Sequence, residues 1–318
     1  MFRKIIDYLN LRQAGGLELF FALLMILSAY SFMGIPLQVV LWSGLFALLL
    51  FKQNKRQIPM FKPLVALAAF VLVHDFIYLF IAKGNLNAYI MQIFYFGSIF
   101  MAAKVFDIEK LKGSLNLVAL ISMVGLLYQW GLIAAGGEVR PIQLPFLDMG
   151  ESRLETFSVR PSSFFMEPAA YVAFMYLPLA FSLIERKFIW TAAIILSEFL
   201  TTSTTGLLTS FIVLIVYVFT QKVNFKIRFF TVAMGVAMLF ALTNVEAFQT
   251  GVNKLEDTNV ETNMRLAQGP YIVSTMEPLE MVAGAAYHNA YDYCMAGRAP
   301  MVVFYKEKIY MSTAWMIV

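Results

Sequence analysis

The chain has 318 residues, of which 60% are hydrophobic and 14% charged, with a formal net charge of +4 and a mean hydropathy of +0.72. Soluble domains carry roughly 25% charged residues, so this composition argues against a protein that covers itself in water. A single cysteine excludes an intramolecular disulfide, and two histidines argue against a histidine-rich metal site.

Long apolar runs recur along the chain, each close to the roughly 20 residues with which a helix crosses ~30 Å of hydrocarbon. They predict an all-α fold, a polytopic transmembrane helical bundle of about 10–11 spans, in which residues 1–318 form a single integral membrane domain. The predicted spans run over about 17–34, 36–51, 63–82, 88–105, 114–135, 167–184, 188–202, 205–220 and 229–246, with a weaker tenth over about 289–305. An eleventh begins near residue 309 and stops at Val318, so the last span is predicted to be truncated. No small-residue cleavage site follows the first apolar run, which we interpret as a retained helix.

The short connections between these spans alternate in charge. Most of the Lys and Arg residues lie in connections of one side, namely the N-terminus, 52–62, 104–113, 185–187 and 221–228. In the short connections of the opposite side, Lys83 is the only Lys or Arg residue. The positive-inside rule therefore predicts a multi-pass protein with a cytoplasmic N-terminus and two long external loops, at about 136–166 and 247–288.

The first external loop is rich in charge. It supplies Arg140, Arg153 and Arg160, and it ends at Glu167. Arginine offers a planar fork of donors that binds phosphate oxygens in bidentate fashion, which suits a lipid-linked phosphate at a membrane surface. The alternative for each arginine is a solvated charge or an ion pair with a nearby glutamate. No metal site is expected.

Glu167 directly precedes Pro168 at the start of a predicted span. Proline in the first turn of a helix loses no hydrogen bond, and a carboxylate at a helix N-terminus is stabilised by the dipole. Glu167 is therefore either a helix cap or a functional carboxylate, and the two roles are compatible.

The second external loop supplies Arg265 and His288. A histidine with an ordinary pKa near 6.5 can accept a proton from a hydroxyl at neutral pH, although a lone histidine is a weak signal. Within the spans, His74, Asp75 and Glu198 are conspicuous. They form either part of a proton relay, as in a transporter, or interhelical hydrogen bonds. The run "TTSTTGLLTS" at 201–210 is interpreted as a structural turn whose hydroxyls could also contact a sugar.

Three segments together resemble the bacterial O-antigen polymerase and O-antigen ligase superfamily. They are "RPSSFFMEPAAYVAFMYLPLA", "LTTSTTGLL", and the loop that contains "NMRLAQGPYIV" and "GAAYHNAYDY". The resemblance covers about residues 114–305. Many members carry a basic residue in the second segment, where Thr204 or Thr205 stands here.

The resemblance implies a membrane glycosyltransferase that works without metal or other cofactor on the outer face of the bacterial inner membrane. The donor would be a polyprenyl-diphosphate-linked glycan and the acceptor another glycan. Arg160 and Arg265 would hold the diphosphate, and His288 would activate the acceptor hydroxyl or orient the phosphate. With Glu167 or His288 as the base and the diphosphate as leaving group, we expect inversion at the anomeric carbon.

The favoured hypothesis is a polymerase of O-antigen, capsule or exopolysaccharide repeat units, with a chain-length regulator and a flippase as candidate partners and no role for nucleic acid. One alternative is an O-antigen ligase that transfers the glycan to a lipid A core. Another class is a lipid-linked sugar flippase or a proton-coupled transporter, which would place its polar residues at the middle of the membrane. A third is a structural membrane subunit.

Overall fold

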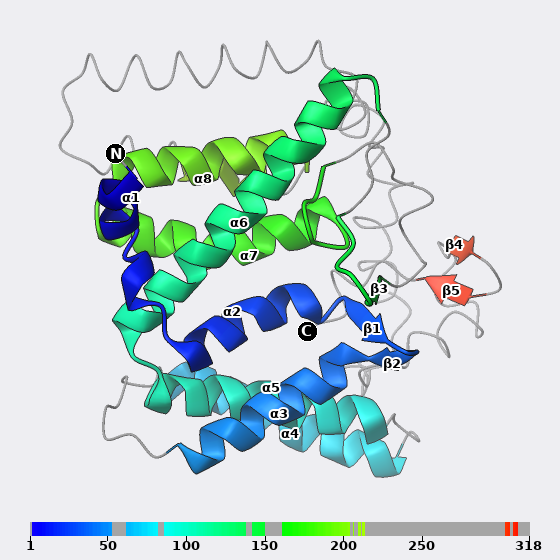
Figure 1. Ribbon diagram of the computed structural model, residues 1–318. Coiled ribbons are helices and arrows are strands. Elements are labelled where there is room, and N and C mark those ends of the chain that lie inside the picture. The colour runs from blue at the N-terminus through cyan, green and yellow to red at the C-terminus, as the bar shows by residue number, and fades with distance from the viewer. Residues whose placement is uncertain are drawn as a thin grey trace. The chain divides into compact units, whose positions relative to one another are not determined.

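Helices dominate the computed structural model (Figure 1). It describes residues 2–52, 62–81, 86–137, 142–149 and 161–203, and a few residues beyond them: 206, 209–210, 212–213, 303–305 and 308–310. The helices in this part of the chain are α1 (Phe2–Tyr8), α2 (Gly16–Leu27), α3 (Leu37–Phe51), α4 (Lys62–Ile81), α5 (Leu86–Val105), α6 (Ile108–Ala134), α7 (Pro168–Ile184) and α8 (Phe188–Leu200), with a 3-10 turn η1 (Leu11–Gln13). The strands are β1 (Tyr30–Phe32), β2 (Ile35–Pro36), β3 (Asp148–Met149), β4 (Val303–Tyr305) and β5 (Lys308–Tyr310).

The predicted spans from 36–51 to 188–202 each coincide with one helix, α3 to α8. The first span was predicted too long, because α2 ends at Leu27 and Tyr30–Phe32 pairs as a strand with β2. Most of the predicted spans 205–220 and 229–246 lies outside the described residues.

The predicted helices near the C-terminus are wrong at the residues that the structure describes. Residues 303–305 and 308–310 form an antiparallel pair, β4 and β5, instead of the end of one helix and the start of another. The physical reason is local: Val303–Tyr305 and Lys308–Tyr310 are rich in β-branched and aromatic residues, and two residues separate them, which is the spacing of a β-hairpin.

By length and composition, α6 is the one helix in the described part of the chain that could cross a membrane. It has 27 residues, whereas the apolar helices α2, α3, α7 and α8 have 12, 15, 17 and 13. A long apolar helix also occurs in the cores of soluble proteins, and α6 is partly buried. The structure therefore shows a helical protein with one candidate membrane span.

The chain divides into two compact units, one formed by residues 1–45 and 106–255 and the other by 46–105 and 256–318. In the second unit α4 packs against α5, with a ring contact between Phe76 and Tyr89 at 6.0 Å. Phe46, near the end of α3, contacts Phe94 of α5 at 5.7 Å. The first unit contains the helices that position the candidate site. A single domain over 1–318 stays a prediction.

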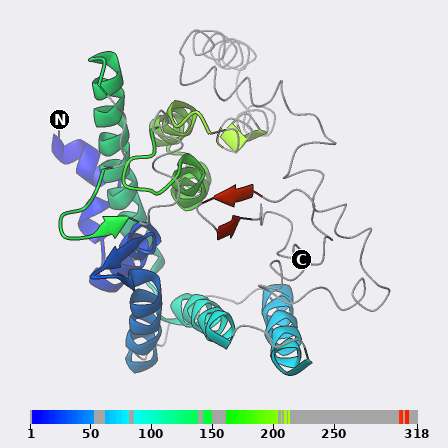
Figure 2. The same ribbon diagram turned by 90° about the vertical axis from the view of Figure 1, so that its right-hand side faces the viewer.

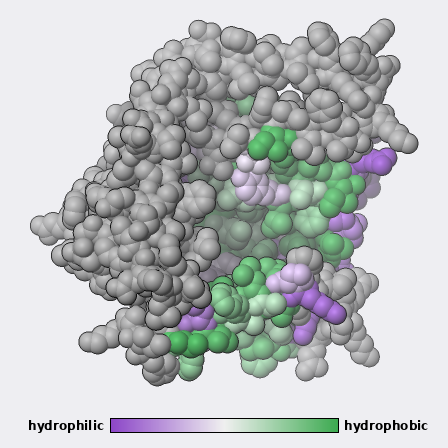
Figure 3. All heavy atoms as spheres, turned by 180° about the vertical axis from the view of Figure 1, so that it is seen from behind, coloured by the Kyte–Doolittle hydropathy of each residue, from purple (hydrophilic) through white to green (hydrophobic). Residues whose placement is uncertain are grey.

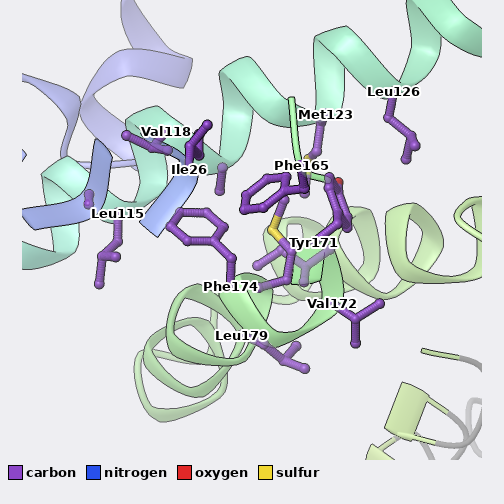
Figure 4. Packing of buried hydrophobic residues seen from close by; sticks show 14 of the residues in the cluster. Ile26, Leu115, Val118, Met123, Leu126, Phe165, Tyr171, Val172, Phe174 and Leu179 are labelled. Atoms are coloured by element: carbon purple, nitrogen blue, oxygen red, sulfur yellow. The ribbon is translucent and has the colours of Figure 1, made fainter. Parts of the chain in front are cut away.

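The core of the first unit lies between α2, α6, α7 and α8 (Figure 4). α7 and α8 run antiparallel, and Figure 2 looks nearly along both while α6 runs across the view. The fully buried side chains of this core include Leu115 and Leu126 of α6, Tyr171 and Met175 of α7, and Ile194 of α8. α6 contacts both α7 and α8, which also pack against each other, so the loops at each end of the unit are brought together.

One end of this unit collects charged side chains, and we call it the basic end (residues 3–15, 107–113 and 185–187). Lys112 Nζ lies 2.6 Å from Glu185 Oε1, and Lys187 Nζ lies 2.7 Å from Glu185 Oε2. Asn116 of α6 donates a hydrogen bond of 3.0 Å to the carbonyl oxygen of Leu9, which brings the N-terminal segment to the same end. Three connections that the charge alternation assigns to one side therefore lie together.

Glu185 gives the basic end a defined pH dependence. Partial burial is the strongest single influence and acts to raise the pKa of Glu185, but hydrogen bonds from Lys112 and Lys187 and their charges together hold the pKa below its usual value. Because the pKa is lower in the folded chain, this group stabilises the fold above the unfolded pKa of about 4.3, and the stabilisation is lost as the pH falls through the folded pKa.

We expect Glu185→Gln to cost about 1–3 kcal/mol at neutral pH, since it removes partly buried ion pairs with two ammonium groups. The measurement is the midpoint of thermal unfolding of the purified protein between pH 7 and pH 3, where the difference between variant and wild type should shrink on acidification. Asp7→Asn is the control, because the Arg12–Asp7 ion pair (Nε to Oδ1, 3.2 Å) is exposed and contributes little. A pH-independent difference would contradict the assignment.

Candidate functional site

The opposite end of the first unit holds the segment that the sequence singled out. We call it the site end (residues 28–36, 129–137, 142–149, 161–171 and 198–203). Trp130 Nε1, near the end of α6, donates a hydrogen bond of 2.9 Å to the carbonyl oxygen of Leu200 at the end of α8. The Tyr30 hydroxyl of β1 lies 2.9 Å from the carbonyl oxygen of Phe164 and 3.1 Å from that of Ile142. Segments far apart in the sequence therefore meet here.

Gln129 of α6 fastens the segment 161–167 to the bundle. Its side chain is fully buried, and Oε1 accepts hydrogen bonds from the backbone N–H groups of Ser162 at 3.0 Å and Ser163 at 2.7 Å. A carbonyl oxygen has two lone pairs, so one amide satisfies two buried donors that no helix or strand would otherwise pair. The peptide that follows Arg160 is thus held in place by α6.

Gly125, four residues before Gln129, provides the space for this segment. Residues four apart lie on one face of a helix, so Gly125 and Gln129 face the same segment. A Cβ atom at Gly125 would collide with Ser163 Oγ and would lie 3.0 Å from Ile142 Cδ1 and 3.1 Å from Phe164 Cε2. Ser163 itself has a φ of 56°, in the left-handed region that non-glycine residues rarely adopt, which indicates that its surroundings impose this conformation.

Glu167 occupies the N-cap position of α7, as the sequence predicts, and Pro168 follows it in the first turn. Its carbonyl oxygen accepts hydrogen bonds from the N–H groups of Ala170 at 3.1 Å and Tyr171 at 3.3 Å. The carboxylate makes no capping hydrogen bond to the α7 backbone. The capping interpretation therefore holds for the backbone of Glu167 and fails for its side chain, which is half-buried.

A buried polar cluster lies beside this segment, between α7, α8 and the residues that follow α8. Glu198 is fully buried two residues before the end of α8, and its Oε2 accepts a hydrogen bond of 2.6 Å from Ser210 Oγ. The Tyr171 hydroxyl lies near Ser197 and Glu198 without a well-formed hydrogen bond to either. Within the described residues Glu198 Oε1 and Thr202 Oγ1 also have no hydrogen-bond partner.

The polar run after α8 packs directly on α7, as its composition predicts for a turn that allows close helix contact. A Cβ atom at Gly206 would lie 2.8 Å from Val172 Cγ2 and 3.0 Å from the carbonyl oxygen of Glu198. Thr201 Oγ1 donates a hydrogen bond of 2.7 Å to the same carbonyl oxygen. The hydroxyl of Thr201 therefore satisfies a backbone group where α8 ends.

The remaining predicted site residues fall outside the part of the chain that the structure describes. These are Arg140, Arg153, Arg160, Arg265 and His288. Arg160 is nevertheless bonded to Pro161, which is buried and next to the residues held by Gln129. Of the predicted site residues, the structure describes Glu167 alone.

His74 and Asp75, the pair that suggested a proton relay, belong to α4 in the other unit. His74 Nδ1 lies 3.0 Å from Asp75 Oδ1, so adjacent side chains bond each other. The interaction is local and not between helices.

Sequence reasoning missed Gln129, Tyr30 and Tyr171, which organise the site end. The pattern of Gly125 and Gln129 at a spacing of four in an otherwise apolar helix was the available signal, since a glutamine in such a helix needs a partner. Tyr30 carried no such signal, because its partners are backbone carbonyl oxygens more than a hundred positions away.

No group of three or more His, Cys, Asp or Glu side chains is placed to hold a metal ion among the residues that the structure describes. Comparison of the chain with protein-family models, with curated proteins and with solved structures finds no match. The function is therefore argued from the residues and their packing.

Proposed function

We propose that the chain is a membrane glycosyltransferase that joins polyprenyl-diphosphate-linked oligosaccharide repeat units into O-antigen, capsule or exopolysaccharide. In this proposal it is a polytopic helical bundle in the bacterial inner membrane, with the basic end in the cytoplasm and the site end outside. The apolar composition supports this arrangement. So does the surface, because hydrophobic residues cover most of the described part of the face in Figure 3.

The observation that carries the proposal is the packing of two segments on which the resemblance rests. The helix that opens with "EPAAY" contacts the run "LTTSTTGLL" at Val172 and Gly206, and Tyr176 and Thr209 share a hydrogen bond of 3.0 Å between their hydroxyl oxygens. Glu167, the hydroxyl-rich turn and the peptide from Pro161 onward, which follows Arg160 in the sequence, then belong to one neighbourhood at the ends of α6, α7 and α8. A diphosphate anchored in the outer leaflet would present its charge at that level.

The chemistry proposed for this neighbourhood needs charge neutralisation and one base. Arg160 and Arg265 bind the diphosphate in bidentate fashion, and Arg140 and Arg153 add further positive charge. Neutralising the diphosphate makes it a better leaving group as the glycosidic bond breaks, and Glu167 or His288 takes the proton from the attacking hydroxyl. Attack opposite to the leaving group inverts the anomeric carbon. Gln129 and Tyr30 position the peptide that carries Arg160.

The test is complementation of a strain that lacks the gene, comparing wild type with Arg160→Ala, Arg265→Ala and His288→Ala at matched membrane expression. We expect polymer formation to fall by about 10²–10³ for the arginine variants, since each removes a charge that stabilises the leaving group. The readout is the banding pattern of surface polysaccharide. Single repeat units indicate a polymerase, whereas polymer retained on its lipid carrier indicates a ligase.

Two controls make the experiment specific. Arg160→Lys keeps the charge and loses the planar fork, so we expect partial activity if bidentate binding matters. Arg12→Ala removes an exposed arginine at the basic end and should leave the polysaccharide unchanged. Normal ladders in Arg160→Ala, Arg265→Ala and His288→Ala would refute the transferase. Loss of function in Asp75→Asn with tolerant loop arginines would instead favour a transporter.

A further inference from the structure

A small β-sheet stands at the site end of the first unit. β1 pairs with β2, Phe32 opposite Ile35, and with β3, Ser31 opposite Asp148. Figure 1 shows the β1–β2 hairpin beyond the end of α2, with the segment that follows α6 reaching it at β3. The Tyr30 hydroxyl bonds this sheet to the carbonyl oxygens of Ile142 and Phe164, so the sheet and the segment 161–167 form one structure.

The sheet and the segment leading into it expose large apolar side chains. Met33 is 82% exposed and Phe146 is 92% exposed, with Ile35 at 57% and Phe32 at 42%. The two chain segments that form this surface, residues 28–36 and 142–149, contain one charged residue, Asp148. A surface of this kind is unfavourable in water, since apolar area left in contact with solvent forfeits about 25 cal/mol per Å².

The two most exposed side chains also occupy strained backbone positions. Met33 has a φ of 50° and precedes Gly34 at 78°, so both central residues of the hairpin turn are left-handed, where Asn-Gly is the favoured pair. Phe146 has a φ of 66°. A bulky residue in this region costs about 1–2 kcal/mol. Neither side chain recovers that cost by packing within the described part of the protein.

The position of the hairpin in the chain bears on what covers these side chains. The hairpin joins the end of α2 to the start of α3, and the exposed apolar surface continues from Ile35 to Val39 and Val40 in the first turn of α3. A sheet with open edges cannot lie in the hydrocarbon, where its unpaired backbone groups would find no partner. At the membrane interface, lipid headgroups and water would satisfy those groups, while the apolar tips would reach the acyl chains.

We propose that the β1–β2–β3 sheet rests in the interfacial layer of the outer leaflet, with Met33 and Phe146 inserted as apolar anchors. Through Tyr30 the anchors hold the segment 161–167 at a constant depth, so that Arg160 meets the diphosphate of a lipid-linked donor at the membrane surface. The occupant of the surface is bilayer lipid. This inference rests on the membrane residence that the proposed function requires.

Nitroxide spin labels test the proposal in the full-length protein. In a Cys294→Ser background, labels are placed by Met33→Cys, Phe146→Cys and, as the deep reference, Val124→Cys, a 59% exposed position midway along α6. The protein is reconstituted into phospholipid nanodiscs. Collision rates with oxygen, which concentrates in lipid, and with a water-soluble nickel complex then report the depth of each label.

We expect the labels at 33 and 146 to collide more often with oxygen than with the nickel complex. Their depth should be about 5–10 Å, which is shallower than that of the label at 124. If the labels at 33 and 146 are as accessible to nickel as free nitroxide in buffer while the label at 124 is deep, this inference is overturned but the proposed function is not. Low accessibility to both reagents would overturn the inference too, because it indicates a protein partner on the sheet. Nickel access to the label at 124 would overturn membrane residence, and with it the proposed function.

Discussion

Gln129→Leu is expected to release the segment 161–167 from α6 while leaving the helices in place. Leucine has a similar volume but accepts no hydrogen bond, so the N–H groups of Ser162 and Ser163 lose the partner they have at 3.0 Å and 2.7 Å. Each buried donor left unpaired costs about 1–3 kcal/mol, which makes a total of about 2–6 kcal/mol. We expect the segment to move toward solvent, so that the measured loss of stability is smaller than this total.

Hydrogen exchange with mass spectrometry measures this release directly. Peptides that contain Ser162 and Ser163 should lose protection in Gln129→Leu, whereas peptides from the middle of α6 should exchange as in wild type. Gln143→Leu is the matched control, because Gln143 lies exposed in the neighbouring segment. If Arg160 acts where we propose, polymer formation should fall together with the protection of Ser162 and Ser163 from hydrogen exchange. Unchanged exchange at Ser162 and Ser163 would show that the glutamine does not fasten the segment.

A pair of glycine variants on α6 is expected to give opposite results. Both Gly125→Ala and Gly131→Ala gain about 1 kcal/mol of helix propensity. The Cβ atom of Gly131→Ala meets nothing within 4 Å, so this variant should be at least as stable as wild type. That of Gly125→Ala collides with Ser163 Oγ, and crowding of this kind costs about 1–3 kcal/mol.

The contrast is measured by thermal unfolding and by the polysaccharide assay on both variants. We expect Gly125→Ala to be less stable than Gly131→Ala and to make shorter or fewer polymers, because Ser163 and the peptide after Arg160 must shift. Equal stability and equal polymer in the two variants would show that Ser163 yields without cost. The close approach at Gly125 would then have no part in positioning the segment.

The candidate site could be anticipated only where one short stretch of sequence carries the signal. Glu167 before Pro168 is such a stretch, and the structure puts Glu167 at the N-cap of α7. Glu198 was conspicuous as a carboxylate in an apolar run, but its complete burial depends on α7 and on Ser210. Gln129 and Tyr30 could not be assigned a role from sequence, because the groups they bind are backbone atoms of distant segments.

The sequence by itself determined the helices α3 to α8 and the gathering of basic connections at one end of the first unit. Both follow from local patterns: apolar runs of helical length and clusters of Lys and Arg between them. Only the tertiary structure decided where α2 gives way to β1, that His74 and Asp75 bond each other, and that Gln129 fastens the peptide after Arg160. These depend on which backbone donors and acceptors the packing leaves unpaired, and that is a property of the folded chain as a whole.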